Sequence, residues 1–347
     1  MSIDPFERVQ LGRASVDVSR LGLGVAALAG LFREVTDEEA AVALEHAWSA
    51  GIRYYDTAPY YGYGLGERRL GQMLEGRDHG GFTVSSKVGR LILPIAQIEA
   101  DPSLEPDRPT VDIPGFDPRE GYFKGTTDER PVFDFSYDGI MRSLEDSLQR
   151  TGLDRIDILW VHDPDAHWDQ AISGAIPALV ALREQGVVSA IGVGMNNAGV
   201  LTRFVREAEL DAVMCAGRYT LLDQGALDDL FPACQERGTA VVAAGVMNSG
   251  LLANPHPDSK YDYAPAPPAL LARALAMKDL CRRHGVPLRA AALQFVFGHP
   301  LVVSAVIGAR KIPHVDDAIA SMQRQIPAQL WDDLRSEGLL PEDVPTP

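Results

Sequence analysis

Three features of the sequence predict an α/β fold in which eight parallel strands close into a (β/α)8 barrel. Short apolar, β-prone segments alternate with longer helical segments along the chain. Eight strands can be counted from Leu21 onward, which favours a closed barrel over an open doubly wound sheet. Ionisable residues also recur where successive strands end. This is the TIM-barrel architecture, and the even composition of the 347 residues, 46% of them hydrophobic, predicts one domain over 1–347.

The elements can be justified in chain order. A short β-hairpin is predicted at the N-terminus, where Arg8–Leu11 and Ala14–Val18 flank a glycine-containing turn. Thr36 with Glu39 forms a capping-box pattern that predicts the start of the first helix. The predicted strands are Leu21–Val25, Ile52–Tyr55, Phe82–Ser86, Ile156–Val161, Val187–Val193, Ala212–Cys215, Ala240–Ala244 and Val302–Ile307. The predicted helices are Asp37–Ala50, Leu65–Leu74, Tyr137–Leu148, Ser173–Gln185, Ala198–Glu207, Ala226–Arg237, Ala269–His284, Val315–Met322 and Gln329–Glu337.

Two connections are long and rich in proline. Arg90–Phe135 is predicted to be irregular, although connections in compact domains rarely exceed about 15 residues without structure of their own. It leaves from the Lys87 strand end, so we interpret it as an ordered active-site loop, with a flexible surface excursion as the alternative. Asn254–Pro268 is predicted to be a second long loop at the same mouth.

Four ionisable residues stand just after predicted strands or at their ends: Asp56, Tyr61, Lys87 and His162. The carboxyl ends of all strands in a parallel barrel open at one face, where active sites form. We therefore expect these four side chains to share one mouth. Each also has a structural interpretation, as a helix cap, a packed ring or a hydrogen-bonded core histidine.

Composition excludes several classes of function. The net charge of -16 argues against a nucleic acid or an acidic membrane surface as partner. No signal peptide is evident, and no run approaches the roughly 18 apolar residues of a membrane span, so we expect a soluble, cytoplasmic protein. The three cysteines lack metal or disulfide spacing and are expected to be buried thiols. No metal site is expected, because the acidic and histidine residues near His162 lack ligand spacing.

Several motifs along the chain carry a family resemblance: Tyr55-Asp56-Thr57-Ala58 with Tyr61-Gly62, Ser86-Lys87-Val88-Gly89, Asp154-Arg155-Ile156-Asp157, His162 and Ile307-Gly308-Ala309-Arg310. With them the chain resembles the aldo-keto reductases over nearly its whole length. Further segments, such as His162-Asp163-Pro164-Asp165 and Gly192-Val193-Gly194-Met195-Asn196, resemble bacterial L-fucose or D-threo-aldose 1-dehydrogenases and the related pyridoxal 4-dehydrogenases.

The resemblance implies a role for each member of the tetrad. Tyr61 would take a proton during oxidation and return it during reduction, while hydride moves between substrate carbon and nicotinamide. A phenol is a weak base near neutral pH, and the ammonium of Lys87 would lower its pKa. Asp56 would hold Lys87, and His162 would bind the substrate oxygen.

The resemblance also implies a site for NAD or NADP without a G-x-G-x-x-G loop. A 2′-phosphate needs charged donors; the chain has His314 near acidic residues instead, so NAD is the expected cofactor, with Arg310 and Lys311 as evidence for NADP. The expected cofactor residues are Gly24, Val25, Gly194, Met195, Asn196, Ala216, Gly245, Val246, Met247, Gly250, Leu251, Ile307, Gly308, Ala309, Arg310, His314 and Asp317.

By the same resemblance, the expected reaction is oxidation of the anomeric hydroxyl of an aldose such as L-fucose to the lactone. Alternatives are a pyridoxal 4-dehydrogenase, a general aldehyde or ketone reductase, or a nucleotide-sensing subunit without turnover. Expected substrate contacts are Tyr60, Asp163, Arg218 and Tyr219, and a pyridoxal ring would stack on Trp168, Tyr60 or Phe135. The oligomeric state is left open.

Overall fold

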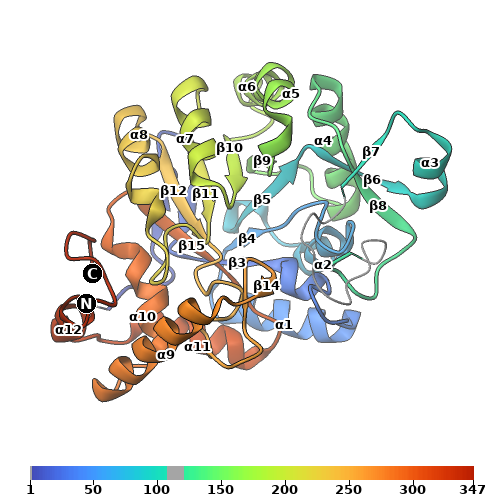
Figure 1. Ribbon diagram of the computed structural model, residues 1–347. Helices are drawn as coiled ribbons and strands as arrows, with labels where there is room; N and C mark the ends of the chain where they lie inside the picture. Colours follow the sequence, from blue (N-terminus) through green and yellow to red (C-terminus); the bar gives the residue numbers. More distant parts are fainter. Residues whose placement is uncertain (1, 108–120) are drawn as a thin grey trace.

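Eight parallel strands close into a barrel in the computed structural model, which describes residues 2–107 and 121–347. Around the barrel the order is β10-β11-β12-β15-β3-β4-β5-β9 (Figure 1). The predicted (β/α)8 fold is confirmed. The barrel strands are β3 (Leu21–Gly24), β4 (Tyr54–Asp56), β5 (Thr83–Val88), β9 (Ile158–His162), β10 (Ala190–Met195), β11 (Ala212–Ala216), β12 (Ala240–Ala244) and β15 (Val302–Gly308).

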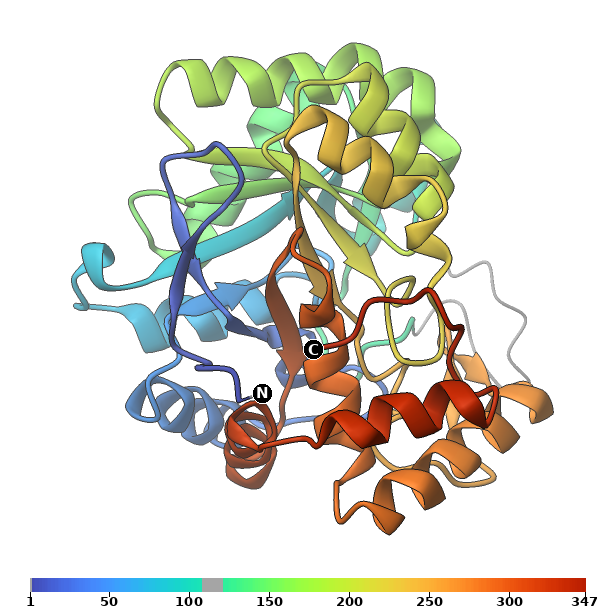
Figure 2. The ribbon, with the colours of Figure 1, turned by 90° about the vertical axis from the view of Figure 1, so that its left-hand side faces the viewer.

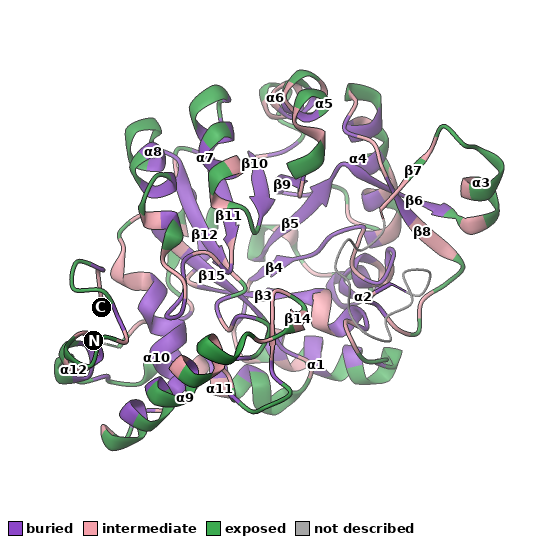
Figure 3. Ribbon diagram, viewed as in Figure 1, coloured by how far each residue is buried: buried purple, intermediate pink, exposed green. Residues whose placement is uncertain are grey.

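Helices surround the barrel and expose their outer faces, whereas the strands are buried (Figure 3). The predicted capping box is present at Thr36, whose hydroxyl accepts a hydrogen bond from the Glu39 amide at 3.1 Å. The main helices are α1 (Asp37–Ser49), α2 (Leu65–Leu74), α4 (Tyr137–Thr151), α6 (Ile176–Glu184), α7 (Ala198–Glu207), α8 (Leu230–Arg237), α9 (Pro268–Arg283), α10 (Leu288–Phe295), α11 (Ile312–Gln323) and α12 (Ala328–Ser336).

The barrel interior is filled by its own cluster of buried side chains, including Tyr54 and Trp160. Glycines on neighbouring strands make room for these rings. A Cβ on Gly22 would lie 2.6 Å from Cδ1 of Tyr54, and one on Gly192 would lie 2.5 Å from Cζ3 of Trp160. A larger apolar layer separates the strands from the helices. The barrel is therefore a packed scaffold that fixes the ends of its strands.

The predicted N-terminal hairpin is present as β1 (Arg8–Gln10) and β2 (Asp17–Ser19), paired antiparallel. Leu11 and Val18 from this hairpin belong to the interior cluster of the barrel. The hairpin therefore covers one end of the barrel, as Figure 2 shows. The opposite, carboxyl-terminal end of the strands carries the long loops.

The prediction that residues 90–135 are irregular is wrong in the described part. β6 (Arg90–Pro94) and β7 (Glu105–Pro106) both pair antiparallel with β8 (Glu129–Phe133), and α3 (Ile95–Ala100) follows β6. A separate apolar cluster, with Leu91, Leu93 and Val132 buried, holds this small sheet together. These strands were not predicted, because they contain prolines and show no regular alternation of buried and exposed residues. Residues 108–120 of the predicted loop lie outside the described residues.

Other differences concern local elements. The second predicted loop contains a hairpin, β13 (Lys260–Tyr261) and β14 (Ala264–Pro265). Helix α10 was not predicted, because its alanine-rich sequence is buried on every side and shows no amphipathic pattern. The helix predicted over Ser173–Gln185 begins earlier, with α5 (Trp168–Gln170) and a π-helical turn at Ala171–Ala175 before α6. None of the described helices has the length and apolar character that a membrane crossing needs.

Candidate active site

A buried ion pair lies at the ends of β4 and β5. Lys87 Nζ donates to Asp56 Oδ2 at 2.6 Å and to the backbone oxygen of Thr57 at 2.9 Å. The hydroxyl of Ser85 donates to Asp56 Oδ1 at 2.7 Å. Only 2% of the Lys87 side chain and 3% of the Asp56 side chain are exposed. The expected contact between these two residues is therefore present, and Asp56 fixes the ammonium in place.

Tyr61 lies against this pair. Lys87 Nζ is 4.7 Å from the centroid of the Tyr61 ring. The ring also meets His162 edge to face, with centroids 5.9 Å apart and planes at 88°. Gly62 and Gly64, both with positive φ, turn the chain after Tyr61 before α2 begins. The structure thus brings together all four residues that the strand ends predicted.

His162 ends β9 and is 7% exposed. Burial is the main cause that lowers the pKa of its imidazole well below the usual value, and the cations of Arg90 and Lys87 lower it further. Its Nδ1 is buried without a hydrogen-bond partner among the described residues, and its Nε2 lies 3.4 Å from Asp163 Oδ2. The imidazole is therefore neutral at physiological pH.

The protonation of Tyr61 differs from the expectation. Burial, followed by the charges of Asp56 and Asp163, raises the pKa of the Tyr61 phenol well above its usual value, and Arg90 opposes this rise. The negative charge of Asp56 offsets the ammonium of Lys87, to which it is bonded. Burial and the two carboxylates therefore outweigh any lowering of the pKa by Lys87 in this structure, where Tyr61 is a neutral phenol near neutral pH.

Sequence reasoning missed two residues at this mouth, Phe123 and Arg90. Phe123 lies beside Tyr60 and Tyr61, with ring centroids 5.5 Å and 6.1 Å away. An isolated antiparallel bridge to Leu31 holds Phe123 there. Arg90 lies next to Tyr60, with its guanidinium 4.8 Å from the ring centroid. The family motif ends at Gly89, so only the position of Arg90 directly after it could have indicated a role.

The expected cofactor residues lie along the remaining arc of the mouth, at the ends of β10, β11, β12, β15 and β3. Val25, Met195, Val246, Leu251 and Ala309 are at most 2% exposed, so their side chains belong to the core and only their backbone can bind a ligand. Gly194, at the end of β10, is also buried, whereas Asn196, Gly245, Gly250 and Gly308 are exposed. The backbone of this arc is therefore accessible at Gly245, Gly250 and Gly308.

Two observations fit a dinucleotide along this arc. Asn248, next to Met247, has a buried side-chain oxygen without a hydrogen-bond partner among the described residues. Gly250, with φ of 96°, has open space where a side chain would lie. An acceptor that lacks a donor and a backbone that a ligand can approach closely are both features of nucleotide sites.

The residues near the expected adenosine end are engaged with the protein. Arg310 Nε donates to the backbone oxygen of Ala27 at 3.2 Å, and a second nitrogen donates to that of Leu31. Asp317 pairs with Arg289 at 2.5 Å, while His314 is exposed. Part of the Arg310 guanidinium, which was evidence for NADP in the sequence, thus donates hydrogen bonds to backbone carbonyls.

The expected substrate contacts divide into two groups. Tyr60 and Asp163 lie beside His162, with a Tyr60 to His162 centroid distance of 5.9 Å. Tyr219 is 1% exposed and packs against Phe231 and Phe295. The prediction that Tyr219 contacts substrate is therefore wrong, because its ring fills the layer between strands and helices.

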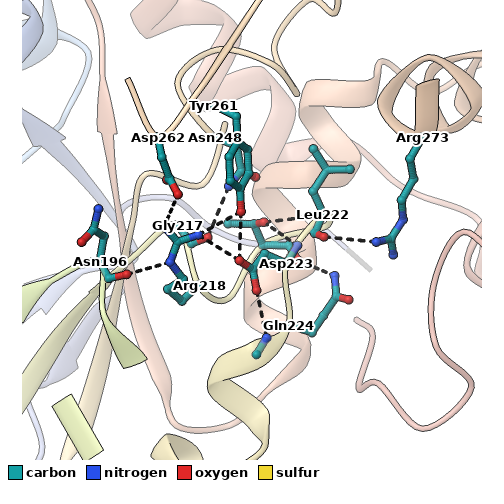
Figure 4. A network of polar contacts seen from close by, with 12 residues as sticks. Asn196, Gly217, Arg218, Leu222, Asp223, Gln224, Asn248, Tyr261, Asp262 and Arg273 are labelled. Carbon is teal, nitrogen blue, oxygen red and sulfur yellow. Dashed lines mark hydrogen bonds and ion pairs between the residues drawn. The ribbon is translucent and has the colours of Figure 1, made fainter. Parts of the chain in front are cut away.

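Arg218 lies at the centre of a polar network (Figure 4). Its guanidinium donates to Asp223 Oδ2 at 3.0 Å and to the hydroxyl of Tyr261 at 2.9 Å, and it pairs with Asp262. Its Nε donates to the backbone oxygen of Asn196 at 2.7 Å. These contacts tie the β13–β14 hairpin to the ends of β10 and β11, so Arg218 has a structural role here, and its substrate contact stays a prediction.

Two of the three rings expected to stack a pyridoxal are also unavailable. Phe135 is fully buried. Trp168 packs on Phe204 of α7, with centroids 4.2 Å apart, and the guanidinium of Arg203 lies 3.7 Å from the Trp168 ring centroid. Only Tyr60 of the three lies at the mouth. Within residues 2–107 and 121–347, no group of three or more His, Cys, Asp or Glu side chains could hold a metal ion.

Residues 20–337 match the model of the Aldo/keto reductase family. The chain belongs to this family. It is therefore an NAD(P)-dependent oxidoreductase. The chain is 44% identical to a D-threo-aldose 1-dehydrogenase from Pseudomonas sp over 331 residues, which cover 94% of this chain and 96% of that protein. It is 40% identical to a pyridoxal 4-dehydrogenase from Microbacterium luteolum, over 98% of this chain and 100% of that one.

Solved structures show the same fold. The holo form of aldo-keto reductase AKR11C1 from Bacillus halodurans superimposes with a TM-score of 0.73 at 24% identity, covering 98% of each chain. The glycerol dehydrogenase AKR11B4 from Gluconobacter oxydans gives a TM-score of 0.69 at 21% identity, covering 98% of this chain and 97% of that one. At these identities the similarity concerns the barrel and not the substrate.

Proposed function

We propose that this aldo-keto reductase oxidises the anomeric hydroxyl of an aldose, such as L-fucose, to the lactone. The observation that carries the proposal is the buried Lys87–Asp56 pair beneath the Tyr61 ring, with a neutral His162 at the ring edge. This arrangement offers one group that exchanges a proton and one that binds an oxygen without carrying charge. A cytoplasmic location belongs to the same proposal.

The chemistry requires the sugar to lose a hydride from C1 and a proton from the anomeric oxygen. The nicotinamide of the bound dinucleotide supplies the hydride acceptor. Tyr61, in its deprotonated form, takes the proton, and neutral His162 donates a hydrogen bond to the same oxygen. Lys87, held by Asp56, places a positive charge near Tyr61. This charge stabilises the phenolate form of Tyr61.

The choice of an aldose is supported by similarity and by the polar groups at the mouth. The D-threo-aldose 1-dehydrogenase has 44% identity over almost the whole chain. Asp163 places a carboxylate beside His162, where it can accept hydrogen bonds from sugar hydroxyls. Tyr60 provides a ring face next to it.

Oxidation of pyridoxal to its lactone is the second candidate, because Tyr60 and Phe123 form an aromatic wall beside Tyr61. General aldehyde or ketone reduction needs the same tetrad and is the third. A nucleotide-sensing subunit without turnover is the non-enzymatic alternative. A panel of L-fucose, other aldoses and pyridoxal, followed by absorbance of the reduced cofactor, separates the substrate classes. A pyridoxal preference over every aldose would refute the aldose proposal.

Tyr61→Phe tests the chemistry itself. The variant removes only the hydroxyl, so we expect turnover to fall about 10²- to 10⁴-fold with unchanged nucleotide affinity, measured by quenching of protein fluorescence. Wild-type turnover in the variant would refute the role of Tyr61. We also propose that NAD is preferred, since Arg310 is bonded to backbone carbonyls. A higher kcat/KM with NADP than with NAD would overturn this preference.

A further inference from the structure

Arg90 is the first residue of β6 and is 5% exposed. It follows Gly89, whose φ of 101° turns the chain out of β5. A side chain on Gly89 would collide with Phe135, since a Cβ there would lie 2.2 Å from its ring. The turn therefore requires glycine and places the Arg90 guanidinium beneath the mouth, at a fixed position relative to Lys87.

Every nitrogen of the Arg90 guanidinium has an acceptor. Nη1 donates to the backbone oxygen of His162 at 2.8 Å, and Nη2 lies 3.3 Å from Asp163 Oδ2. Nε donates to the carboxylate of Asp107. The guanidinium also lies 4.8 Å from the Tyr60 ring centroid. One side chain thus connects β6 and the insertion to the end of β9.

Asp163 has a backbone conformation that needs such support. Its φ is 44°, in the left-handed region that non-glycine residues rarely adopt, and its amide donates to the backbone oxygen of Gly194 at 3.1 Å. The carboxylate is thereby turned back toward His162 Nε2. Arg90 holds both the backbone oxygen of His162, just before this turn, and the carboxylate of Asp163 itself.

We propose that Arg90 is a positioning residue that fixes the orientation of His162 and Asp163, and that its positive charge further opposes protonation of the His162 imidazole. The orientation follows from the hydrogen bonds to the backbone oxygen of His162 and to Asp163. Burial is the main cause of the neutrality, and the buried positive charge of Arg90 adds to it.

The charged and titratable groups around His162 define what Arg90 contributes. Lys87 on β5 and Arg90 on β6 are the cations that lower the pKa of the imidazole. Asp163 is the anion beside Nε2, and it acts in the opposite direction. Tyr60 and Tyr61 contribute aromatic rings and phenols that are neutral because burial raises their pKa. When the Arg90 charge is removed, Lys87 is the cation that still lowers the pKa of His162, while the Asp163 carboxylate still raises it. We therefore expect the pKa of His162 to rise.

The test separates charge from geometry with two substitutions. Arg90→Met removes both, whereas Arg90→Lys keeps the charge and loses the fork of hydrogen bonds. We expect kcat for sugar oxidation to fall about 10²-fold in Arg90→Met and about 10-fold in Arg90→Lys, with the KM for the nucleotide unchanged. Arg282→Met is the control, because Arg282 is an exposed arginine on α9 and should leave kcat unchanged.

A titration by NMR measures the imidazole without turnover. The His162 signal is identified by its loss in His162→Gln. We expect the pKa of His162 to rise in Arg90→Met and to stay low in Arg90→Lys. Asp163→Asn, which removes the anion and keeps the shape, should leave His162 neutral to lower pH than in the wild type.

Each outcome decides the proposal. The proposal is supported if the pKa of His162 rises in Arg90→Met and does not rise in Arg90→Lys. An unchanged His162 pKa in folded Arg90→Met, or unchanged kcat in Arg90→Lys, overturns it. If Arg90→Met does not fold, Arg90→Lys and Asp163→Asn decide by the same two measurements. Because the titration needs no substrate, it still tests Arg90 if the proposed sugar oxidation itself proves wrong.

Discussion

Replacing Asp56 by asparagine should destabilise the protein far more than an ordinary surface change. The substitution keeps the shape of the side chain and removes its charge, which leaves the Lys87 ammonium, 2% exposed, with neutral oxygen acceptors and no negative charge beside it. Removing one partner of a buried ion pair costs about 3–5 kcal/mol, because the other charge stays buried. Asp279 provides a matched control, since its pair with Arg282 is 70% and 79% exposed and should contribute at most about 1 kcal/mol.

The assay is urea denaturation followed by circular dichroism, applied to Asp56→Asn, Lys87→Met, the double variant and Asp279→Asn. We expect the double variant to be more stable than the sum of the two single changes implies, by about 1–3 kcal/mol, because it leaves no uncompensated charge. The reasoning is refuted if Asp56→Asn costs no more than Asp279→Asn. It is also refuted if the two single effects at the buried pair are additive.

Three further predictions follow from other contacts. Burial raises the pKa of the Tyr61 phenol, so the phenolate needed for oxidation becomes more abundant as pH rises above neutrality. We therefore expect kcat/KM for oxidation to increase up to tenfold per pH unit between about pH 7 and about pH 9. A flat profile would contradict this. Arg218→Met removes the ion pair and hydrogen bonds that hold the β13–β14 hairpin, so amide exchange measured by mass spectrometry should accelerate in residues 260–265 and not in the barrel strands. Gly71→Ala should destabilise by about 1–3 kcal/mol in urea denaturation, because its Cβ would lie 1.9 Å from a backbone oxygen of α4, whereas Gly81→Ala meets no atom within 4 Å and should cost much less.

The sequence was sufficient to predict the barrel and the tetrad because both depend on short-range patterns. Helix α2 and helix α7 have the predicted bounds. Asp56, Lys87 and His162 each lie at the carboxyl end of a strand, and the closure of the barrel places neighbouring strand ends together. Tyr61 needs only a short turn to join them. The topology therefore converts local sequence positions into a site.

The parts that were not predicted depend on contacts between distant segments. Tyr219 follows β11, where a side chain can be exposed to substrate, but its ring packs against Phe231 of α8 and Phe295 of α10. Phe123 reaches the mouth through a bridge to Leu31. The raised pKa of Tyr61 likewise results from its three-dimensional surroundings. No periodicity within one segment encodes such contacts.

This difference between strand ends and loops suggests how the site divides its tasks. Asp56 and Lys87 are fixed by β4 and β5 and bonded to each other, so their geometry does not depend on the insertion after β5. His162 is fixed by β9, but Arg90 also bonds its backbone oxygen and joins it to Asp107. A change in the insertion can therefore reach the imidazole and the Asp163 carboxylate without disturbing the ion pair. Under the proposed function, substrate selection can thus vary through the insertion while the Lys87–Asp56 pair stays in place.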